Sequence, residues 1–265
     1  MPPAPTRART HPPVPRRGGT AAARRPGSAR RPRARRGAAW GAVALVGAAV
    51  VGVVLAVRPG RTGGPASPVC TVATTVGRWQ LDPAQAQNAA IIAAVGHRLG
   101  MPDHAVTVAV TTALQESHLH DLTYGDRDSV GLFQQRPSQG WGTRTEILDP
   151  AYAAAAFYTH LRKVPGWDTL PVTEAAQAVQ LSAAPTAYAS HEAEGRAIAV
   201  AVTGEEPAAL TCHAAAFEGA APAPGALADA ATAQFGAPVL AVALPEQLAW
   251  QVAAWAVAHA AAYHV

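Results

Sequence analysis

Glu116 is the side chain whose position most suggests acid–base chemistry. It falls on a predicted helix that begins at Asp103 and runs through the stretch AVTVAVTTALQESHL. Ala109, Ala113 and Glu116 follow the spacing i, i+4 and i+7, so Glu116 continues the apolar face near the helix end. Partial burial there raises the pKa of a carboxyl group and keeps a general acid protonated near neutral pH. The alternative is a surface Glu that hydrogen-bonds to Ser117 or pairs with an arginine.

Two further carboxylates precede the segment Gly131–Gln134. Asp126 and Asp128 lie in the stretch GDRDS, where a second carboxylate would position a water molecule, although aspartates are also common turn formers. His118 and His120 are two residues apart, so on a helix they point to nearly opposite sides, and no HExxH or Cys–His cluster accompanies them. The sequence also lacks a phosphate-binding glycine loop and a nucleophile motif. We therefore expect neither a metal nor a cofactor.

The stretch ALQESHLHDLTYGDRDSVGLFQQRP resembles the lysozyme-like superfamily, especially the bacterial lytic transglycosylases and the goose-type lysozymes. These families pair a Glu-Ser at a helix end with a downstream Gly-Leu-(Met or Phe)-Gln, and the resemblance covers roughly residues 80–204. It implies that Glu116 is the catalytic acid/base and that the downstream segment lines a glycan groove, with Gln134 as a hydrogen-bonding wall. The matching substrate-site residues are Ser117, Gly131, Leu132, Phe133 and Gln134.

A tyrosine on a later helix is a further feature of these families. They carry Ala-Tyr-Asn there, and the tyrosine lies beside the catalytic Glu. This sequence has Ala187-Tyr188 followed by Ala189, so the resemblance makes Tyr188 a partner of Glu116 without the hydrogen bond of the Asn. An ordinary core aromatic is the alternative for Tyr188.

Glycosidic cleavage normally uses two carboxylates, but lytic transglycosylases use one. The resemblance therefore implies cleavage of the MurNAc–GlcNAc β-1,4 bond of peptidoglycan, by hydrolysis or by anhydro-sugar formation. Two other classes of protein are considered. A catalytically inactive peptidoglycan-binding or scaffold module would keep the groove, which the missing Asn would suit. A transporter subunit is disfavoured, because one spanning helix without an intramembrane charge forms no pathway.

Helices must hold these residues. Asp82-Pro83 and Asp149-Pro150 each give an N-cap followed by a proline at the first helical position, and Thr173 is the predicted cap of a later helix. The intervening stretch TYGDRDSVGLFQQRPSQGWGT is rich in Gly, Asp, Ser and Pro and predicts loop and a short hairpin. The fold class expected is mainly α, a lysozyme-like helical domain with a small β-hairpin insertion.

Charge divides the chain sharply. Residues 1–57 hold eleven arginines and no acidic residue, whereas the remainder has 10 basic and 17 acidic residues, a net charge of −7. Residues 1–37 predict a disordered cytoplasmic tail that faces anionic lipid and binds no nucleic acid. The uncharged run 38–57 reaches ~30 Å as a helix, enough to cross a bilayer, and the arginines before it place the N-terminus in the cytoplasm. A cleaved signal peptide is the alternative.

Outside the membrane, residues 58–68 predict a flexible linker and residues 69–214 the lysozyme-like domain. Cys70 and Cys212 are the only cysteines, and in an oxidising extracytoplasmic compartment we expect them to form a disulfide. Residues 215–226 predict a second linker. The remaining residues, 227–265, are too few for a substantial core and predict a partial or truncated second domain.

Overall fold

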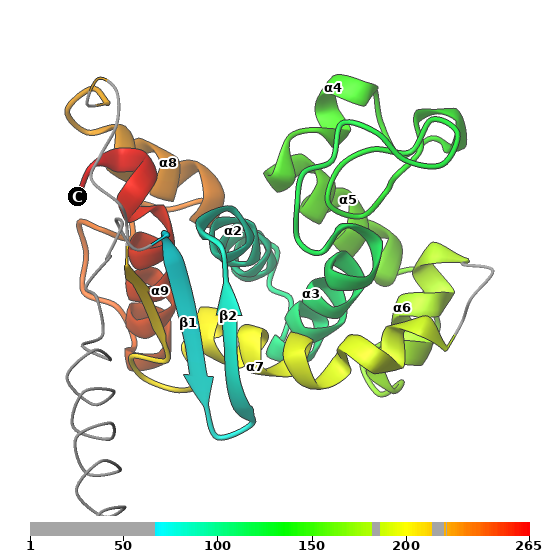
Figure 1. Cartoon of the computed structure of the whole chain (residues 1–265), viewed down its shortest axis with the longest axis horizontal. Helices are drawn as coiled ribbons and strands as arrows, with labels where there is room; N and C mark the ends of the chain where they lie inside the picture. The colour runs from blue at the N-terminus through cyan, green and yellow to red at the C-terminus, as the bar shows by residue number, and fades with distance from the viewer. Residues whose placement is uncertain (1–66, 182–185, 214–219, 221) are drawn as a thin grey trace, which may run out of the picture. The chain divides into compact units, whose positions relative to one another are not determined.

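The computed structural model describes residues 67–181, 186–213, 220 and 222–265. They form a mainly helical structure with a small antiparallel sheet (Figure 1). The elements, in chain order, are β1 (Val69–Thr74), β2 (Gly77–Leu81), α2 (Pro83–Arg98), α3 (Asp103–Ser117), η1 (Pro137–Gln139), α4 (Arg144–Ile147), α5 (Pro150–Leu161), α6 (Val172–Gln180), η2 (Ala187–His191), α7 (Glu192–Thr203), β3 (Leu210–His213), α8 (Ala226–Phe235) and α9 (Glu246–Tyr263).

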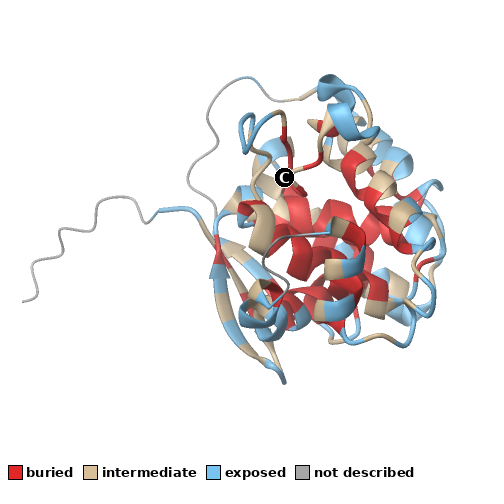
Figure 2. Cartoon of the chain, turned by 90° about the vertical axis from the view of Figure 1, so that its right-hand side faces the viewer, coloured by how far each residue is buried: buried red, intermediate tan, exposed pale blue. Residues whose placement is uncertain are grey.

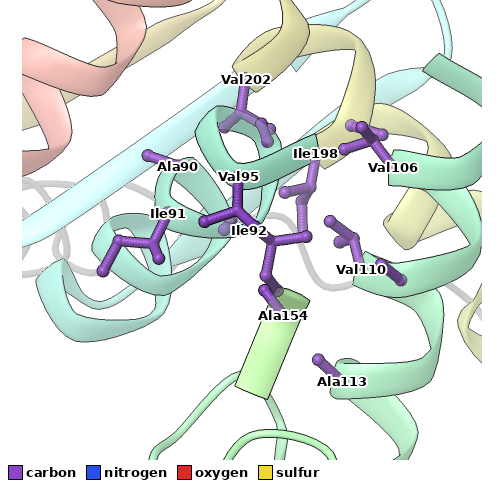
Figure 3. Close-up of a cluster of buried hydrophobic side chains, with 14 of the residues drawn as sticks. Ala90, Ile91, Ile92, Val95, Val106, Val110, Ala113, Ala154, Ile198 and Val202 are labelled. Atoms are coloured by element: carbon purple, nitrogen blue, oxygen red, sulfur yellow. The ribbon is translucent and has the colours of Figure 1, made fainter. Parts of the chain in front are cut away.

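The central helix α2 begins where the sequence indicates. The Asp82 side chain accepts from the Gln85 backbone N–H, and the Gln85 side chain accepts from the Asp82 backbone N–H, which completes a capping box ahead of Pro83. Apolar side chains of α2 then pack against α3, α5 and α7, and Figure 3 shows Ile92 and Val95 among Val110, Ala154 and Ile198. Figure 2 shows that buried positions gather where these helices meet.

Helix α7 lies close against α3, the helix that carries Glu116. Gly195 makes this approach possible, because a Cβ there would lie 2.1 Å from the Thr111 hydroxyl oxygen of α3. Helix α6 packs on α3 as well. It begins at Val172 after Pro171, two residues earlier than a cap at Thr173 would place it, so Thr173 is not its cap. The end of α3 is thus surrounded by elements from distant parts of the sequence.

The sheet has the order β2-β1-β3, and all its pairs are antiparallel. The sequence interpretation placed a hairpin within 123–143 instead, but the β pairing described in that segment is a single isolated antiparallel bridge between Val130 and Gln135. In the register of β1 and β3, Cys70 lies opposite Cys212, and the two form the expected disulfide. The hairpin expectation is therefore wrong in place, and the disulfide is confirmed in this structure.

Residues 227–265 do not form a separate domain. Helices α8 and α9 pack on α2, and α9 also contacts α7 and β3, so these residues belong to the same compact unit as the preceding helices. Phe235 and Trp255 are buried in the common core, and the Gln251 side chain donates to the Ala93 carbonyl of α2 at 3.0 Å. The apolar stripe on α9 thus has its partner within the chain, which corrects the expectation of a truncated second domain.

The predicted cytoplasmic tail 1–37, the predicted spanning helix 38–57 and almost all of the predicted linker 58–68 lie outside the described residues. Among the helices that are described, none combines the length and the apolar character needed to cross a bilayer.

His259 gives this fold a dependence on pH. It is fully buried in α9, stacks on Trp255 with 4.0 Å between ring centroids, and its Nδ1 lies 2.8 Å from the Trp255 carbonyl oxygen. Burial lowers the pKa of His259 from 6.5 to about 4. The unfolded chain therefore takes up the proton first, so the stability that neutral His259 contributes is present above pH 6.5 and is lost as the pH falls toward 4.

We expect the free energy of unfolding to fall by up to about 3 kcal/mol between pH 7 and pH 4 through this residue alone. His259→Phe keeps an aromatic ring beside Trp255 and should flatten that part of the pH dependence. Urea denaturation at pH 7, 5.5 and 4 measures it. Parallel stability curves for the parent and the variant would contradict the assignment.

Candidate active site

Glu116 lies in the last turn of α3 and is partly buried. Its Oε1 accepts a hydrogen bond of 2.7 Å from the Tyr188 hydroxyl, and the Gln180 side chain is a second hydrogen-bond partner. Burial raises the pKa of Glu116, and the hydrogen bonds from Tyr188 and Gln180 oppose the rise without cancelling it. Position 116 therefore holds a carboxyl group that retains its proton to higher pH than an ordinary Glu.

Tyr188 reaches Glu116 from η2, which packs against α3. Its side chain is fully buried, so the ring belongs to the core, and its hydroxyl donates a hydrogen bond to the Glu116 carboxyl group. Tyr188 is thus both a core aromatic and a hydrogen-bond partner of Glu116. Ala189, which follows Tyr188, is exposed.

Gln180, at the end of α6, was not anticipated from the sequence. Its Nε2 donates to the Phe133 carbonyl at 2.8 Å while its side chain also hydrogen-bonds to Glu116, so it connects the segment Gly131–Gln134 to the carboxyl group. The sequence feature that could have indicated its position is the spacing of four residues from the buried Ala176, which places Gln180 at the edge of the packed face of α6.

The segment Gly131–Gln134 lies next to the end of α3. Ser117 is buried, and its hydroxyl donates to the Leu132 carbonyl at 2.7 Å, with the Ala113 carbonyl at 3.0 Å as a second acceptor. Ser117 therefore joins the helix end to this segment.

Leu132 and Phe133 are fully buried, and Phe133 stacks on Phe157 with 4.7 Å between ring centroids. Their side chains are core, not groove lining. Gly131 has φ 78°, and a Cβ there would lie 2.7 Å from the Ile147 carbonyl oxygen, so the tight turn requires glycine. The Leu132 and Phe133 carbonyls accept from Ser117 and Gln180, so the segment is joined to the neighbours of Glu116 through its backbone.

Gln134 organises the loop before it. Its backbone is left-handed at φ 48°, and its side-chain amide donates to the carbonyls of Tyr124 and Gly131, each at 3.3 Å. Its Oε1 lies 3.3 Å from the Ser129 hydroxyl, which donates to it. Through these bonds Gln134 stabilises the loop of residues 124–131, while its side chain stays partly exposed.

Neither Asp126 nor Asp128 is hydrogen-bonded to Glu116 in the described structure. Asp126 is exposed, with Arg127 at 3.9 Å. Asp128 accepts from the Ser138 backbone N–H at 2.8 Å and from Arg136 at 2.7 Å, and these bonds hold its pKa well below the ordinary range. Both residues behave as the turn-forming aspartates of the alternative interpretation.

Asp121 is a carboxylate that the sequence interpretation overlooked. Burial, together with repulsion from Asp149, raises the pKa of Asp121 to about 6. Its Oδ1 is buried, and a Cβ on Gly131 would lie 3.4 Å from it. Asp121 therefore lies close to the turn at Gly131, and a lone Asp after a helix gives no sequence signal for this.

Two surface hollows flank the elements that hold Glu116. One, of about 420 Å³, lies between α6 and η2 and is lined by Gln177, Ala178 and Ala189 among others. The other, of about 360 Å³, lies between the ends of α5 and α6 and includes His160 and Leu181. The Trp141 ring contacts the His160 ring beside this second hollow, with 3.9 Å between ring centroids and a tilt of 30°.

Within the described ranges, no cluster of three or more His, Cys, Asp or Glu side chains is arranged to hold a metal ion. His118 makes an edge contact with His191, and His120 pairs with Asp82 at 2.8 Å, so the two histidines contact different elements.

The sequence matches no family model, and no curated protein matches it.

Proposed function

We propose that this protein is a peptidoglycan-cleaving glycosidase that acts on the MurNAc–GlcNAc β-1,4 bond with Glu116 as its general acid and base. The observation that carries the proposal is the protonatable Glu116 carboxyl, partly buried and hydrogen-bonded by the Tyr188 hydroxyl and by Gln180. A carboxyl group with a raised pKa suits proton donation to a leaving sugar oxygen. A module that only binds glycan has no need of a carboxyl group with a raised pKa.

The reaction needs a single carboxyl group in two successive roles. Protonated Glu116 donates its proton to the glycosidic oxygen as the bond from C1 to that oxygen breaks, and the acetamido group of the same sugar stabilises the positive charge at C1. The Glu116 carboxylate then takes the proton of the 6-hydroxyl group, and the oxygen of that hydroxyl group bonds to C1. This closes a 1,6-anhydro ring and returns Glu116 to its starting state.

The placement of Asp126 and Asp128 favours this route over hydrolysis. A hydrolase of this kind needs a second carboxylate that activates or positions water. Asp128 is committed to Arg136 and Ser138, and Asp126 is exposed beside Arg127. Anhydro-sugar products are therefore the expected outcome, and reducing ends would indicate a water-positioning group elsewhere.

We also propose that the enzyme is anchored to the outer face of the cytoplasmic membrane through residues 38–57, with peptidoglycan strands as its partner. The apolar run and the arginine bias before it support the anchor and its orientation. The disulfide of Cys70 and Cys212 supports an oxidising, extracytoplasmic location for the folded part.

The test is digestion of purified sacculi by the detergent-solubilised full chain. Soluble muropeptides with anhydro ends, identified by mass spectrometry and missing from a Glu116→Gln reaction, are the expected result. Cosedimentation with sacculi but no release by either protein would identify a binding module and overturn the enzymatic proposal.

Tyr188→Phe is expected to lower kcat by about 10- to 100-fold, because the ring stays in the core while the hydroxyl that steadies the Glu116 carboxylate is lost. That hydroxyl lowers the pKa of Glu116, so its removal raises this pKa further. Activity that needs protonated Glu116 then declines at higher pH than in the parent. Muropeptide release measured from pH 4 to 9 checks both effects, and an unshifted alkaline limb would argue against direct coupling.

A further inference from the structure

The chain leaves α3 through an unusual turn directly after Glu116. His118 and Leu119 both have left-handed backbones, with φ values of 51° and 60°, and neither is glycine. L-residues disfavour this conformation, and two in succession persist only where the surroundings hold them. The Leu119 side chain is fully buried, which gives one reason for the turn but leaves its backbone carbonyl in need of a partner.

The start of α2 supplies partners for each residue of this turn. Gln85 Nε2 donates to the His118 carbonyl at 2.9 Å, and Asn88 Nδ2 donates to the Leu119 carbonyl at 2.8 Å. The third contact is between Asp82 Oδ2 and His120 Nε2, also at 2.8 Å.

The N-cap Asp82 and the α2 residues Gln85 and Asn88 are spaced by three and share one face at the start of α2. We term them the α2 clamp. Asn88 is its most buried member, with only 8% of its surface exposed, so its hydrogen bond is shielded from water. Gln85 serves two purposes, because its Oε1 also completes the capping box of α2 through the Asp82 backbone N–H.

We propose that the α2 clamp positions Glu116 by holding the left-handed turn that ends α3. Asn88 is then a positioning residue that acts through the backbone and does not touch substrate. This inference rests on the proposed glycan-cleaving function, because it concerns the residues that fix the position of the same carboxyl group, Glu116.

The geometry explains how the clamp reaches the site. If the turn at His118 and Leu119 relaxes, the last turn of α3 is no longer fixed. The bond from Ser117 to the Leu132 carbonyl and the bond from Tyr188 to Glu116 both depend on that last turn. A misplacement of about 1 Å at a reacting group can cost about a hundredfold in rate.

The test compares Asn88→Ala with Gln251→Ala. Gln251 is the matched control, because it is equally buried and its amide also donates to a backbone carbonyl, that of Ala93, but on the side of α2 that faces α9. Asn88→Ala is expected to lower kcat for muropeptide release by about 10- to 100-fold with KM within about threefold. Gln251→Ala is expected to leave both constants within about threefold.

A second readout does not depend on activity. The pKa of the Glu116 carboxyl, followed by NMR in the purified chain, is expected to fall in Asn88→Ala, because a loosened helix end admits water to the carboxyl group, and to stay at the parent value in Gln251→Ala. If the parent releases no muropeptides but this difference in titration is seen, the proposed function fails and the clamp stands.

Two further variants guard against simple unfolding. Gln85→Met keeps helix propensity at a partly exposed position while it removes the donor to His118, and it should produce a smaller loss of kcat of the same kind. His118→Gly in the Asn88→Ala background removes the penalty of one left-handed residue and should restore part of the lost kcat. Equal kcat, KM and Glu116 pKa in Asn88→Ala and Gln251→Ala would overturn the proposal.

Discussion

Glu116→Gln is expected to lower kcat for muropeptide release by roughly 10³- to 10⁴-fold, at the upper end of what a general acid contributes. Gln has nearly the same shape as Glu, and its side-chain oxygen can still accept from the Tyr188 hydroxyl. What it cannot do is give a proton to the glycosidic oxygen or take one from the 6-hydroxyl. The loss should therefore fall on kcat, while binding of the variant to sacculi stays within a few-fold of the parent.

The same substitution has an opposite effect on stability. Because burial raises the pKa of Glu116 in the folded chain, the folded state holds this proton more tightly than the unfolded state does. Stability is therefore lost as the pH rises through the folded pKa, when a charge appears in a partly buried place. Gln carries no charge, so the variant should be at least as stable as the parent at pH 8, with the advantage vanishing near pH 4.

Thermal denaturation at these two pH values measures the stability effect, and initial rates of muropeptide release measure the activity. Glu246→Gln, an exposed carboxylate at the start of α9, is the matched control and should change neither. An inactive but well-folded Glu116→Gln excludes misfolding as the cause. Substantial activity retained in that variant would remove Glu116 from the reaction.

Helices whose signals are local could be predicted from the sequence. The pairs Asp82-Pro83 and Asp149-Pro150 each place a capping carboxylate and a proline within two residues, so the starts of α2 and α5 require no knowledge of the rest of the fold. The spacing that put Glu116 at the end of an apolar helical face is equally local, and the structure places Glu116 there, partly buried.

Features that depend on distant residues were missed or misplaced. Strand β3 pairs with β1 over a long sequence separation, and although the predicted disulfide joins Cys212 to Cys70, the four residues of β3 do not predict a strand there. Residues 227–265 were assigned to a second domain because they are too few for a core of their own, yet α9 packs on α2, α7 and β3 and shares their core. Gln180 and Asn88 likewise act on backbone carbonyls of residues far along the chain, at Phe133 and Leu119, which no sequence spacing reveals.

The segment Gly131–Gln134 illustrates a different error. The resemblance suggested that its side chains line a groove, but Leu132 and Phe133 are buried in the core. Hydrophobic residues in a loop beside the end of a core helix are more economically explained by core packing than by groove lining. The carbonyl groups of Leu132 and Phe133, held by Ser117 and Gln180, are the parts that connect this segment to Glu116.

Removal of the disulfide is expected to produce the largest loss of stability. The bond joins residues 142 apart in the sequence, and closing so long a loop in the unfolded chain corresponds to roughly 4 to 5 kcal/mol in the entropic model. In Cys70→Ala/Cys212→Ala we expect this loss, which for a domain of this size lowers Tm by about 10 to 20 °C. Urea denaturation of the parent, with and without reductant, and of the double variant measures this loss of stability. The reduced parent should have the same free energy of unfolding as the double variant.

The same variant separates stability from catalysis. The bond ties edge strand β3 to β1, whereas Glu116 is held by α2, α3, α6 and η2, none of which contains a cysteine. Cys70 lies opposite Leu81, next to Asp82 of the α2 clamp, but the bonds from Gln85 and Asn88 to the turn after α3 do not involve the sheet. At 25 °C the folded double variant should therefore keep kcat within about threefold of the parent. Its activity should be lost sooner on heating, because the unfolded state is reached at lower temperature. A loss of kcat at 25 °C without unfolding would show that the sheet takes part in positioning Glu116, and an unchanged Tm would contradict the stabilising role of the bond.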